Sequence, residues 1–559
     1  MYILKEQSDI IPMKPKRIDL VIVLCFLLFA SLYQVNRMAG NSRYLLLSSD
    51  SENVVSFAAA GEHPEFFSGD ELLSNKQNFR FYLIIHLPLI KTISKFSGDY
   101  ASAFLSLIGL HIFLQLLGFY ILGFIIFQNR YWAVLLAIAT LMHIPLAMGE
   151  FWGMYCEPLT RVSFQTILPY LLAAVFYFHR KPAVWPWLFV VIGIMMYIHS
   201  VSVPAWGLSI WLGMWLFLPS DWNLFKKIRT MFFLCVILIL TVSPFFIHYL
   251  MNHTHGRIEN YDTTFEIMKY RSYKGCFDIP LAFNQFFSNI TFFRIFALGL
   301  IGCLFVWFYK NTERKKILVI WLWFIGILFT AVIIPLAEQA ICRTYRIIPL
   351  ETELVRNLRY LPPLMLIFCI WPFAIMAGDS LNRINKKVFF FIGTLLVLVW
   401  SSRQMYKHVV YLEKRGCFLF QPDKTNSAQT LDILNSLKTL SPTGSRVLSL
   451  ASFSELAVRY HALRPLVYAG KDGGALYYNN QEELIRWYDK TKEIAGITRS
   501  MNSKLDDKTK MALLLELSRK FKAQFLLVNC NLFSEPFLKT EKNIVYQNNS
   551  YALIKINTY

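Results

Sequence analysis

Long apolar runs without charged side chains constrain this chain more than any other feature. The segment from Ala101 to Phe127 contains no Asp, Glu, Lys or Arg, and neither does the segment 183–220. A helix of about 20 apolar residues is long enough to cross a bilayer. Because 55% of the 559 residues are hydrophobic and only 16% are charged, one or two soluble cores would not bury this apolar surface. We therefore expect an α-helical polytopic membrane protein.

The hydropathy pattern predicts about eleven transmembrane helices. They lie at residues 19–35, 101–127, 131–149, 162–179, 183–199, 201–219, 229–250, 291–309, 317–337, 360–378 and 387–401. Lys and Arg gather in every second connection, and cytoplasmic loops collect these residues. The N-terminus is therefore expected in the cytoplasm, and an odd number of spans places the C-terminal segment outside. The first span lacks a small-residue cleavage pattern, so we expect an uncleaved anchor.

The chain is expected to form two domains. Residues 1–401 form the transmembrane domain, with a first outer loop at 36–100 and an interfacial helix at 80–95. Residues 402–559 form a C-terminal soluble α/β domain on the outer face. Strands are expected in this domain at 446–450, 465–468 and 524–528, helices at 453–461, 480–495 and 507–522, and a hairpin turn at Asn548–Asn549.

The net charge of +20 does not indicate a nucleic-acid partner. The basic residues lie mainly in short gaps between apolar runs and in the C-terminal quarter, so most of the excess follows the membrane topology. From Arg403 onward there are 23 Lys and Arg against 14 Asp and Glu. This domain either favours anionic membrane lipids and phosphates or simply has a solvated basic surface. The nine cysteines include no CxxC pair, which excludes a typical redox or zinc motif.

Carboxylates are concentrated in the first outer loop. Asp50 and Glu52 are two residues apart, and Asp70 and Glu71 are adjacent. Converging carboxylates can act as a general base toward an acceptor hydroxyl, or hold a divalent cation against a phosphate. The alternative is an ordinary solvated loop.

Basic and aromatic side chains occur at the outer edge of the later spans: Arg161, His199, Arg356, Arg359 and Tyr360. The planar fork of arginine suits phosphate, because it donates two parallel hydrogen bonds and stays charged. We expect these residues to bind a lipid phosphate or pyrophosphate. The alternatives are snorkelling at the interface, pairing with neighbouring glutamates, or, for His199, a neutral histidine satisfied by another helix.

Two further segments leave alternatives open. The glycines of 469–474 could bring backbone N–H groups close to an anion, or this segment could be a strand-to-helix turn. His253 and His255 match a metal site only loosely, because side chains two residues apart converge on a strand and not on a helix.

Together these motifs resemble the polytopic glycosyltransferases of superfamily C (GT-C), and more closely a group of uncharacterised bacterial GT-C-like membrane proteins. The resemblance is carried by 50–52, 63–71, Arg161, His199, 356–360, 464–465, 471–472 and 487–488. It covers most of the chain, although the acidic motifs fit only a relaxed form of the family pattern.

The resemblance implies an inverting glycosyltransferase of the bacterial inner membrane. It would move a sugar from a polyprenyl-phosphate donor to a lipid or surface-glycan acceptor on the extracytoplasmic face. Asp50 or Asp70 would be the base, assisted by Glu52 or Glu71, and a divalent cation (Mg²⁺ or Mn²⁺) could take part. The main alternative is a polysaccharide polymerase or ligase, or a protein that binds or transports a lipid-linked glycan without chemistry.

Overall fold

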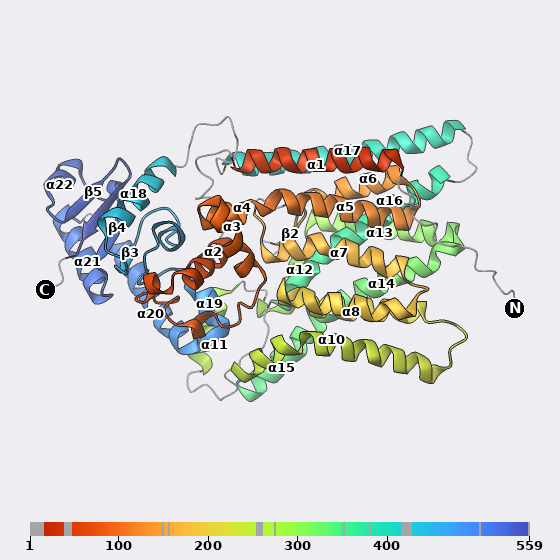
Figure 1. Cartoon of the computed structure of the whole chain (residues 1–559), viewed down its shortest axis with the longest axis horizontal. Helices are drawn as coiled ribbons and strands as arrows, with labels where there is room; N and C mark the ends of the chain where they lie inside the picture. The colour runs from red at the N-terminus through yellow and green to blue at the C-terminus, as the bar shows by residue number, and fades with distance from the viewer. Residues whose placement is uncertain are drawn as a thin grey trace.

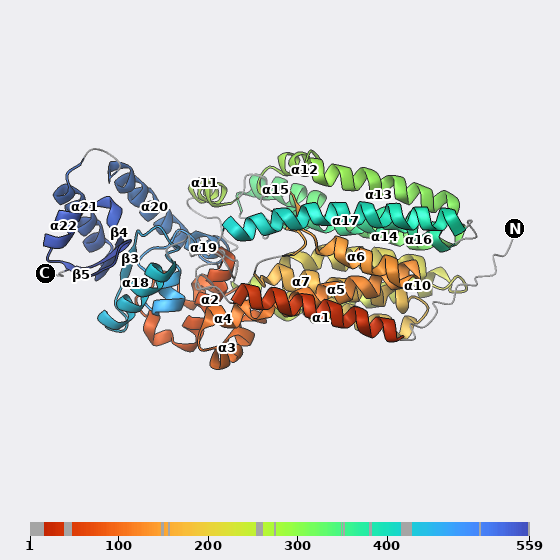
Figure 2. The same cartoon turned by 90° about the horizontal axis from the view of Figure 1, so that it is seen from above.

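The computed structural model describes residues 16–38, 47, 49–146, 150–154, 157–252, 261–272, 276–347, 349, 353–378, 383–414, 427–501 and 505–556. Long helices run roughly side by side in a bundle (Figure 1, Figure 2). One end of the bundle carries the described part of the predicted first outer loop, 36–100, called the first outer segment, and residues 427–556, called the C-terminal segment. The start of α1 (Arg17–Met38) lies at the opposite end (Figure 1). The segments predicted to lie outside thus gather at one end of the molecule.

Each of the eleven predicted spans falls on a helical segment. The bundle helices after α1 are α5 (Leu107–Phe127), α6 (Arg130–Leu141), α7 (Thr160–Tyr177), α8 (Trp185–Ile194), α9 (Val203–Met214), α10 (Leu224–Asn252), α13 (Ile290–Tyr309), α14 (Arg314–Leu328), α15 (Ile334–Tyr345), α16 (Leu361–Gly378) and α17 (Arg383–Lys414).

Seven helical segments of the described chain are long and apolar enough to cross a membrane. They are Arg17–Met38, Tyr100–Phe127, Ser200–Phe217, Leu224–Met251, Ile290–Tyr309, Asn311–Tyr345 and Leu354–Ala377. The predicted class, an α-helical polytopic membrane protein, is confirmed by this architecture. The number of eleven spans stays a prediction.

The span predicted at 131–149 is too long. Helix α6 ends at Leu141, and the chain then forms a small hairpin in which β1 (Ile144–Pro145) pairs antiparallel with β2 (Phe151–Trp152). A proline inside a helix removes a backbone hydrogen bond and clashes with the preceding turn, so Pro145 favours this break. The hairpin brings the start of the 150–161 segment back against the bundle.

Helix α17 is longer than the predicted span at 387–401, since it continues to Lys414. The helix is therefore continuous across residues 401 and 402, where the two domains were predicted to meet. The division into two domains stays a prediction. Tyr33 of α1 is hydrogen bonded to His408 of α17, with 3.0 Å between Oη and Nε2. The first and last helices of the bundle thus contact each other.

Helices α13 and α16 approach each other closely at Gly302. A Cβ atom at this position would lie only 2.1 Å from the carbonyl oxygen of Phe368. Glycine is required there because any side chain would force the two helices apart.

The segment predicted as an interfacial helix, 80–95, contains a helix that starts later, and its place at the membrane surface stays a prediction. Helix α3 (His86–Ser97) begins two residues before Pro88, which is tolerated in the first turn of a helix and not further in. Its Ile90 side chain is fully buried, while Phe96 is 89% exposed. This amphipathic arrangement suits a helix lying along a membrane surface.

Short helices and one sheet complete the end of the bundle that the sequence predicts to lie outside, called the outer end below. The helices are α2 (Ser49–Glu62), α4 (Tyr100–Leu105), α11 (Tyr261–Arg271), α12 (Ile279–Phe287), α18 (Ser427–Leu440), α19 (Asp472–Asn479), α20 (Gln481–Met501), α21 (Asp507–Lys520) and α22 (Glu535–Thr540). The strands are β3 (Val447–Ser449), β4 (Phe525–Asn529), β5 (Ile544–Gln547) and β6 (Tyr551–Lys555).

The C-terminal segment contains helices and one sheet, whereas a separate C-terminal α/β domain stays a prediction. Its strands follow the order β3-β4-β6-β5, with β3 parallel to β4 and the remaining pairs antiparallel. The hairpin turn at Asn548–Asn549 joins β5 to β6, as predicted. The strand predicted at 465–468 is wrong, because only Leu466 forms a bridge, to Val447. The helix predicted at 453–461 is reduced to a π-helical turn at Val458–Ala462.

A buried ion triad joins the first outer segment to the C-terminal segment. Arg459 donates through Nε and Nη2 to the two carboxylate oxygens of Asp70, at 2.8 and 2.7 Å. It also donates to both oxygens of Asp472, at 2.6 and 2.8 Å. All three side chains are almost completely inaccessible to solvent. A buried charge is stable only with such partners, so the triad fixes how the two segments dock.

Replacing Arg459 with methionine should destabilise this docking by about 3 to 5 kcal/mol, because two buried carboxylates then lose their shared cation. We expect a lower apparent melting temperature in detergent and faster proteolysis of the C-terminal segment. Arg486→Met is the matched control, since Arg486 is 68% exposed and forms a surface ion pair with Glu483. Equal apparent melting temperatures for the two variants would contradict a stabilising role for the triad.

Candidate functional site

The centre of the candidate site is the buried carboxylate of Glu150. The hairpin after α6 positions it: the N–H of Leu146 donates to the carbonyl oxygen of Glu150 at 2.8 Å. The next residues form β2, and Trp152 is fully buried. The side chain of Glu150 is itself only 3% exposed, so its charge needs partners.

Three arginines from two distant parts of the chain supply these partners. Arg359 Nη1 donates to Glu150 Oε2 at 2.8 Å, and Arg356 Nε donates to Oε1 at 2.6 Å. Arg161 Nη1, on the first turn of α7, lies 3.5 Å from Oε1. Burial raises the pKa of Glu150, but the three guanidinium groups outweigh burial and hold the pKa well below its usual range. Glu150 is therefore a permanent anion at the centre of this arginine cluster.

A second layer of contacts supports the arginine cluster. The hydroxyl of Ser202 lies 2.8 Å from Nδ1 of His199 and 2.6 Å from the hydroxyl of Tyr360. Nη2 of Arg359 lies 3.5 Å from the same oxygen. Tyr360 is fully buried among the aromatic rings of Trp152, Phe164 and Trp206.

This arrangement corrects one sequence expectation. Tyr360 was expected to contact substrate, but it lies behind Arg359 and is absent from the described wall of the cavity. It holds Ser202, and through it the cluster, in place. His199 does line the cavity.

A large cavity lies in front of the arginine cluster. Its volume is about 1540 Å³, and Arg161, His199, Arg356 and Arg359 all line it. The wall also contains apolar side chains of α10 and α15, namely Phe245, Phe246, Leu250, Ile334 and Ile341. A cavity of this size can hold a ligand larger than a single sugar.

Asp50 is the predicted carboxylate that faces this cavity. It lies in the first turn of α2, and its side chain is 59% exposed. Its Oδ2 is 3.7 Å from Nη1 of Arg161. Asp50 therefore combines accessibility with a place beside the arginine cluster.

Glu52 does not converge with Asp50. Both residues lie on helix α2, and helical residues two positions apart point to nearly opposite sides. Glu52 is 4% exposed and hydrogen bonded with Ser454 of the C-terminal segment. Burial, reinforced by the charges of Glu157 and Glu455, raises the pKa of Glu52 to about 8. It is largely protonated at neutral pH, so the structure argues against its expected role as a charged partner of the base.

Asp70 and Glu71 are also directed away from the cavity. Asp70 accepts from Arg459 and from the backbone N–H groups of Leu72, Leu73 and Leu466. This leaves no accessible oxygen for a substrate proton, which argues against Asp70 as the base. Glu71 pairs with Arg446 at 3.2 Å and Lys490 at 2.7 Å. Both residues hold the C-terminal segment in place.

The described wall of the cavity fits an anion better than a metal cation. No cluster of three or more His, Cys, Asp or Glu side chains that could hold a metal is found among the described residues. His253 and His255 lie outside these residues. The described wall carries four arginines and Lys471 against three carboxylates, those of Asp50, Glu338 and Glu353, and an excess of cations repels Mg²⁺ or Mn²⁺. The divalent cation therefore stays a prediction with no donor set to support it here.

Two cavity residues were not predicted to bind substrate. Lys471 lies within the glycine-rich segment 469–474 of the C-terminal segment, and Arg271 ends α11. The 469–474 segment leads into α19, so it is a turn before a helix and also part of the cavity wall. A lysine within a glycine-rich turn could have suggested anion binding by Lys471. The residues around Arg271 contain no comparable motif.

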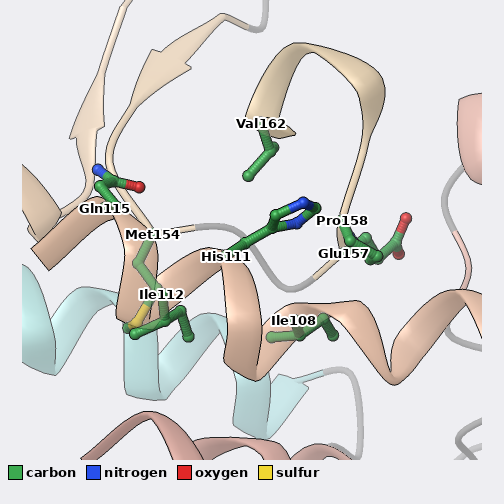
Figure 3. A pocket seen from close by; sticks show the side chains of 8 residues that line it. All are labelled: Ile108, His111, Ile112, Gln115, Met154, Glu157, Pro158 and Val162. Carbon is green, nitrogen blue, oxygen red and sulfur yellow. The ribbon is translucent and has the colours of Figure 1, made fainter. Parts of the chain in front are cut away.

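A second, much smaller pocket lies next to His111 (Figure 3). Its volume of about 10 Å³ has room for one water molecule. In Figure 3 the imidazole of His111 rises from α5 toward Pro158, and the carboxylate of Glu157 points away from it. The hydroxyl of Ser163 lies 2.9 Å from His111 Nε2 and 2.7 Å from His86 Nε2. This pocket is too small for a substrate.

No protein-family model and no curated protein matches the chain. Among solved structures, it is similar to the crystal structure of ArnT from Cupriavidus metallidurans bound to undecaprenyl phosphate. The match covers 96% of this chain and 97% of that chain, with 12% sequence identity and a TM-score of 0.45.

The raised pKa of Glu52 predicts a pH-dependent stability. In the folded state this carboxyl keeps its proton up to about pH 8, whereas its ordinary pKa is 4.5. The free energy of unfolding should therefore fall as the pH rises between these values, by at most about 5 kcal/mol. The side chain of Glu52→Gln stays neutral at every pH. At pH 8.5 this variant should therefore have a higher melting temperature than the unmodified protein.

Thermal unfolding in detergent at pH 5 and pH 8.5 checks this expectation. Glu65→Gln is the control, because Glu65 belongs to the same outer segment and is 60% exposed. If Glu52→Gln lost as much stability between the two pH values as the control, burial of Glu52 would not be the cause.

Proposed function

We propose that the protein is a membrane glycosyltransferase that moves a sugar from a polyprenyl-phosphate donor to an acceptor hydroxyl at the outer end of the bundle. One observation carries the proposal: an exposed carboxylate, Asp50, shares a large, partly apolar cavity with a cluster of three arginines. A base, a site for phosphate and a wall for a lipid are the three parts that this reaction needs.

The arginine cluster would bind the donor phosphate. Arg161 and Arg359 line the cavity, and the buried Nε of Arg359 has no hydrogen-bond partner among the described residues. Negative charge grows on the phosphate as the bond to the anomeric carbon breaks. Fixed cations in a site with little water stabilise this charge more strongly than solvent does. Glu150 is the positioning residue that keeps the guanidinium groups together.

The apolar wall would hold the polyprenyl chain. Phe246 and Leu250 of α10 and Ile341 of α15 all line the cavity, and between 43% and 53% of each side chain is exposed. Apolar side chains that are left open in this way are favourable contacts for an isoprenoid and unfavourable ones for water. A phosphate at one side and an apolar wall beside it match an amphipathic lipid phosphate.

Asp50 would act as the general base. The acceptor hydroxyl gives its proton to the carboxylate, and its oxygen forms a bond to the anomeric carbon. The bond from that carbon to the phosphate oxygen breaks, and its electron pair leaves with the polyprenyl phosphate. Because attack and departure take place on opposite faces of the sugar, this scheme inverts the anomeric configuration.

Asp50→Asn should lower the rate of transfer by about 100-fold to 10,000-fold, the usual contribution of a general base. Donor binding should change little, because the arginine cluster is intact. The measurement is the release of polyprenyl phosphate from purified protein supplied with radiolabelled single-sugar donors and an envelope lipid extract. Glu65→Gln is the control from the same outer segment.

A normal rate for Asp50→Asn would remove this residue from the mechanism. Movement of a whole glycan chain, with no use of single-sugar donors, would favour a polymerase or ligase instead. Binding without any change in covalent structure would favour a transport or binding protein.

A further inference from the structure

Lys471 brings a charge from the C-terminal segment into the cavity. It directly precedes α19 and lines the cavity together with Gly474. Its neighbour Asp472 belongs to the buried triad with Arg459 and Asp70. The triad thus fixes the backbone from which Lys471 extends.

Arg271 lies against the same turn. A Cβ atom at Gly474 would be only 2.8 Å from Nη2 of Arg271, so the guanidinium occupies space that only glycine leaves open. Arg271 also lines the cavity. The two cations come from α11 and from the turn before α19, and these two helices contact each other.

Neither cation is neutralised by an ion pair. Among the described residues, no carboxylate lies within 4.0 Å of the charged groups of Lys471 or Arg271, and Nε of Arg271 is buried without a hydrogen-bond partner. Burial lowers the pKa of Lys471, and the charge of Arg271 lowers it further, whereas the carboxyl groups of Asp50, Glu52 and Glu455 raise it. Two like charges at one half-buried wall are unfavourable unless an anion binds between them.

Asp50 connects this pair of cations with the arginine cluster. Its carboxylate is 3.7 Å from Arg161, and its charge also raises the pKa of Lys471. The proposed base therefore has cations on both sides. One set would hold the donor phosphate, which leaves the other for a second ligand that must also approach the base.

We infer that Lys471 and Arg271 form a second anion subsite, which binds a phosphate or carboxylate group carried by the acceptor. This inference deepens the proposed function and rests on it, because the subsite is assigned to the acceptor by its position beside Asp50. The C-terminal segment thereby selects an anionic acceptor, and its docking through the triad places the selecting residue.

Binding to the full-length protein in nanodiscs tests the subsite. The probes are a short-chain polyprenyl phosphate, dihexanoyl phosphatidic acid and inorganic phosphate, with dihexanoyl phosphatidylcholine as a zwitterionic comparison. Lys471→Met and Arg271→Met should each weaken binding of phosphatidic acid by about tenfold, the loss of one charge-assisted contact. Lys471→Arg should retain it. Binding of polyprenyl phosphate should be unchanged in these variants and weakened in Arg161→Met.

Lys269→Met is the control, since Lys269 lies on the same helix as Arg271 and pairs with Glu266 on the surface. If Lys471 is needed for binding of phosphatidic acid but inorganic phosphate does not bind, the acceptor is a lipid. If inorganic phosphate binds as tightly as phosphatidic acid, the acceptor is a soluble phosphorylated molecule. Unchanged binding of both anions in Lys471→Met and Arg271→Met would overturn the subsite. Failure of polyprenyl phosphate to depend on Arg161 would instead count against the proposed function, so the two failures are distinguishable.

Discussion

The buried carboxylate of Glu150 is the constraint on which the site depends. An ionised group without solvent is stable only if cations and hydrogen-bond donors surround it. Arg356 and Arg359 precede α16, and Arg161 lies in the first turn of α7. All three form ion pairs with Glu150. Glu150 directly precedes the second strand of the short hairpin after α6, and this hairpin turns the chain back into the bundle. One anion thus gathers three cations at the floor of the cavity.

A second buried charge, that of Arg459, organises the outer end. It neutralises Asp70 of the first outer segment and Asp472 of the C-terminal segment. The cavity is therefore enclosed by three parts of the chain: the helix bundle, the first outer segment and the C-terminal segment. The carboxylate of Glu150 and the ion triad around Arg459 have a positioning role in the proposed mechanism. Both determine where the accessible groups, Asp50 and Lys471, lie.

The sequence predicted the helical membrane class and several cavity residues because these depend on local patterns. Charge-free apolar runs identify spans, and arginines at span ends identify a possible phosphate site. Asp50, Arg161 and Arg359 do meet at one cavity. The roles of Glu52 and Asp70 could not be predicted, because they depend on helical phase and on contacts with distant residues.

The residues missed by sequence analysis show the same limit. Lys471 and Arg271 are 200 positions apart, and only the docking of the C-terminal segment brings them to one wall. Tyr360 follows Arg359 directly, yet one side chain faces the cavity and the other packs behind it. Residue type suggested phosphate binding for both, and both are buried, but only Arg359 lines the described wall of the cavity.

The most direct test of the account is a cryo-EM structure of the protein with a non-transferable polyprenyl-phosphate sugar analogue. The account predicts the phosphate within hydrogen-bond distance of Arg161 and Arg359, the lipid chain along α10 and α15, and Asp50 on the face of the anomeric carbon opposite the phosphate. A phosphate bound away from the arginine cluster, or a sugar that Asp50 cannot reach, would contradict the central claim.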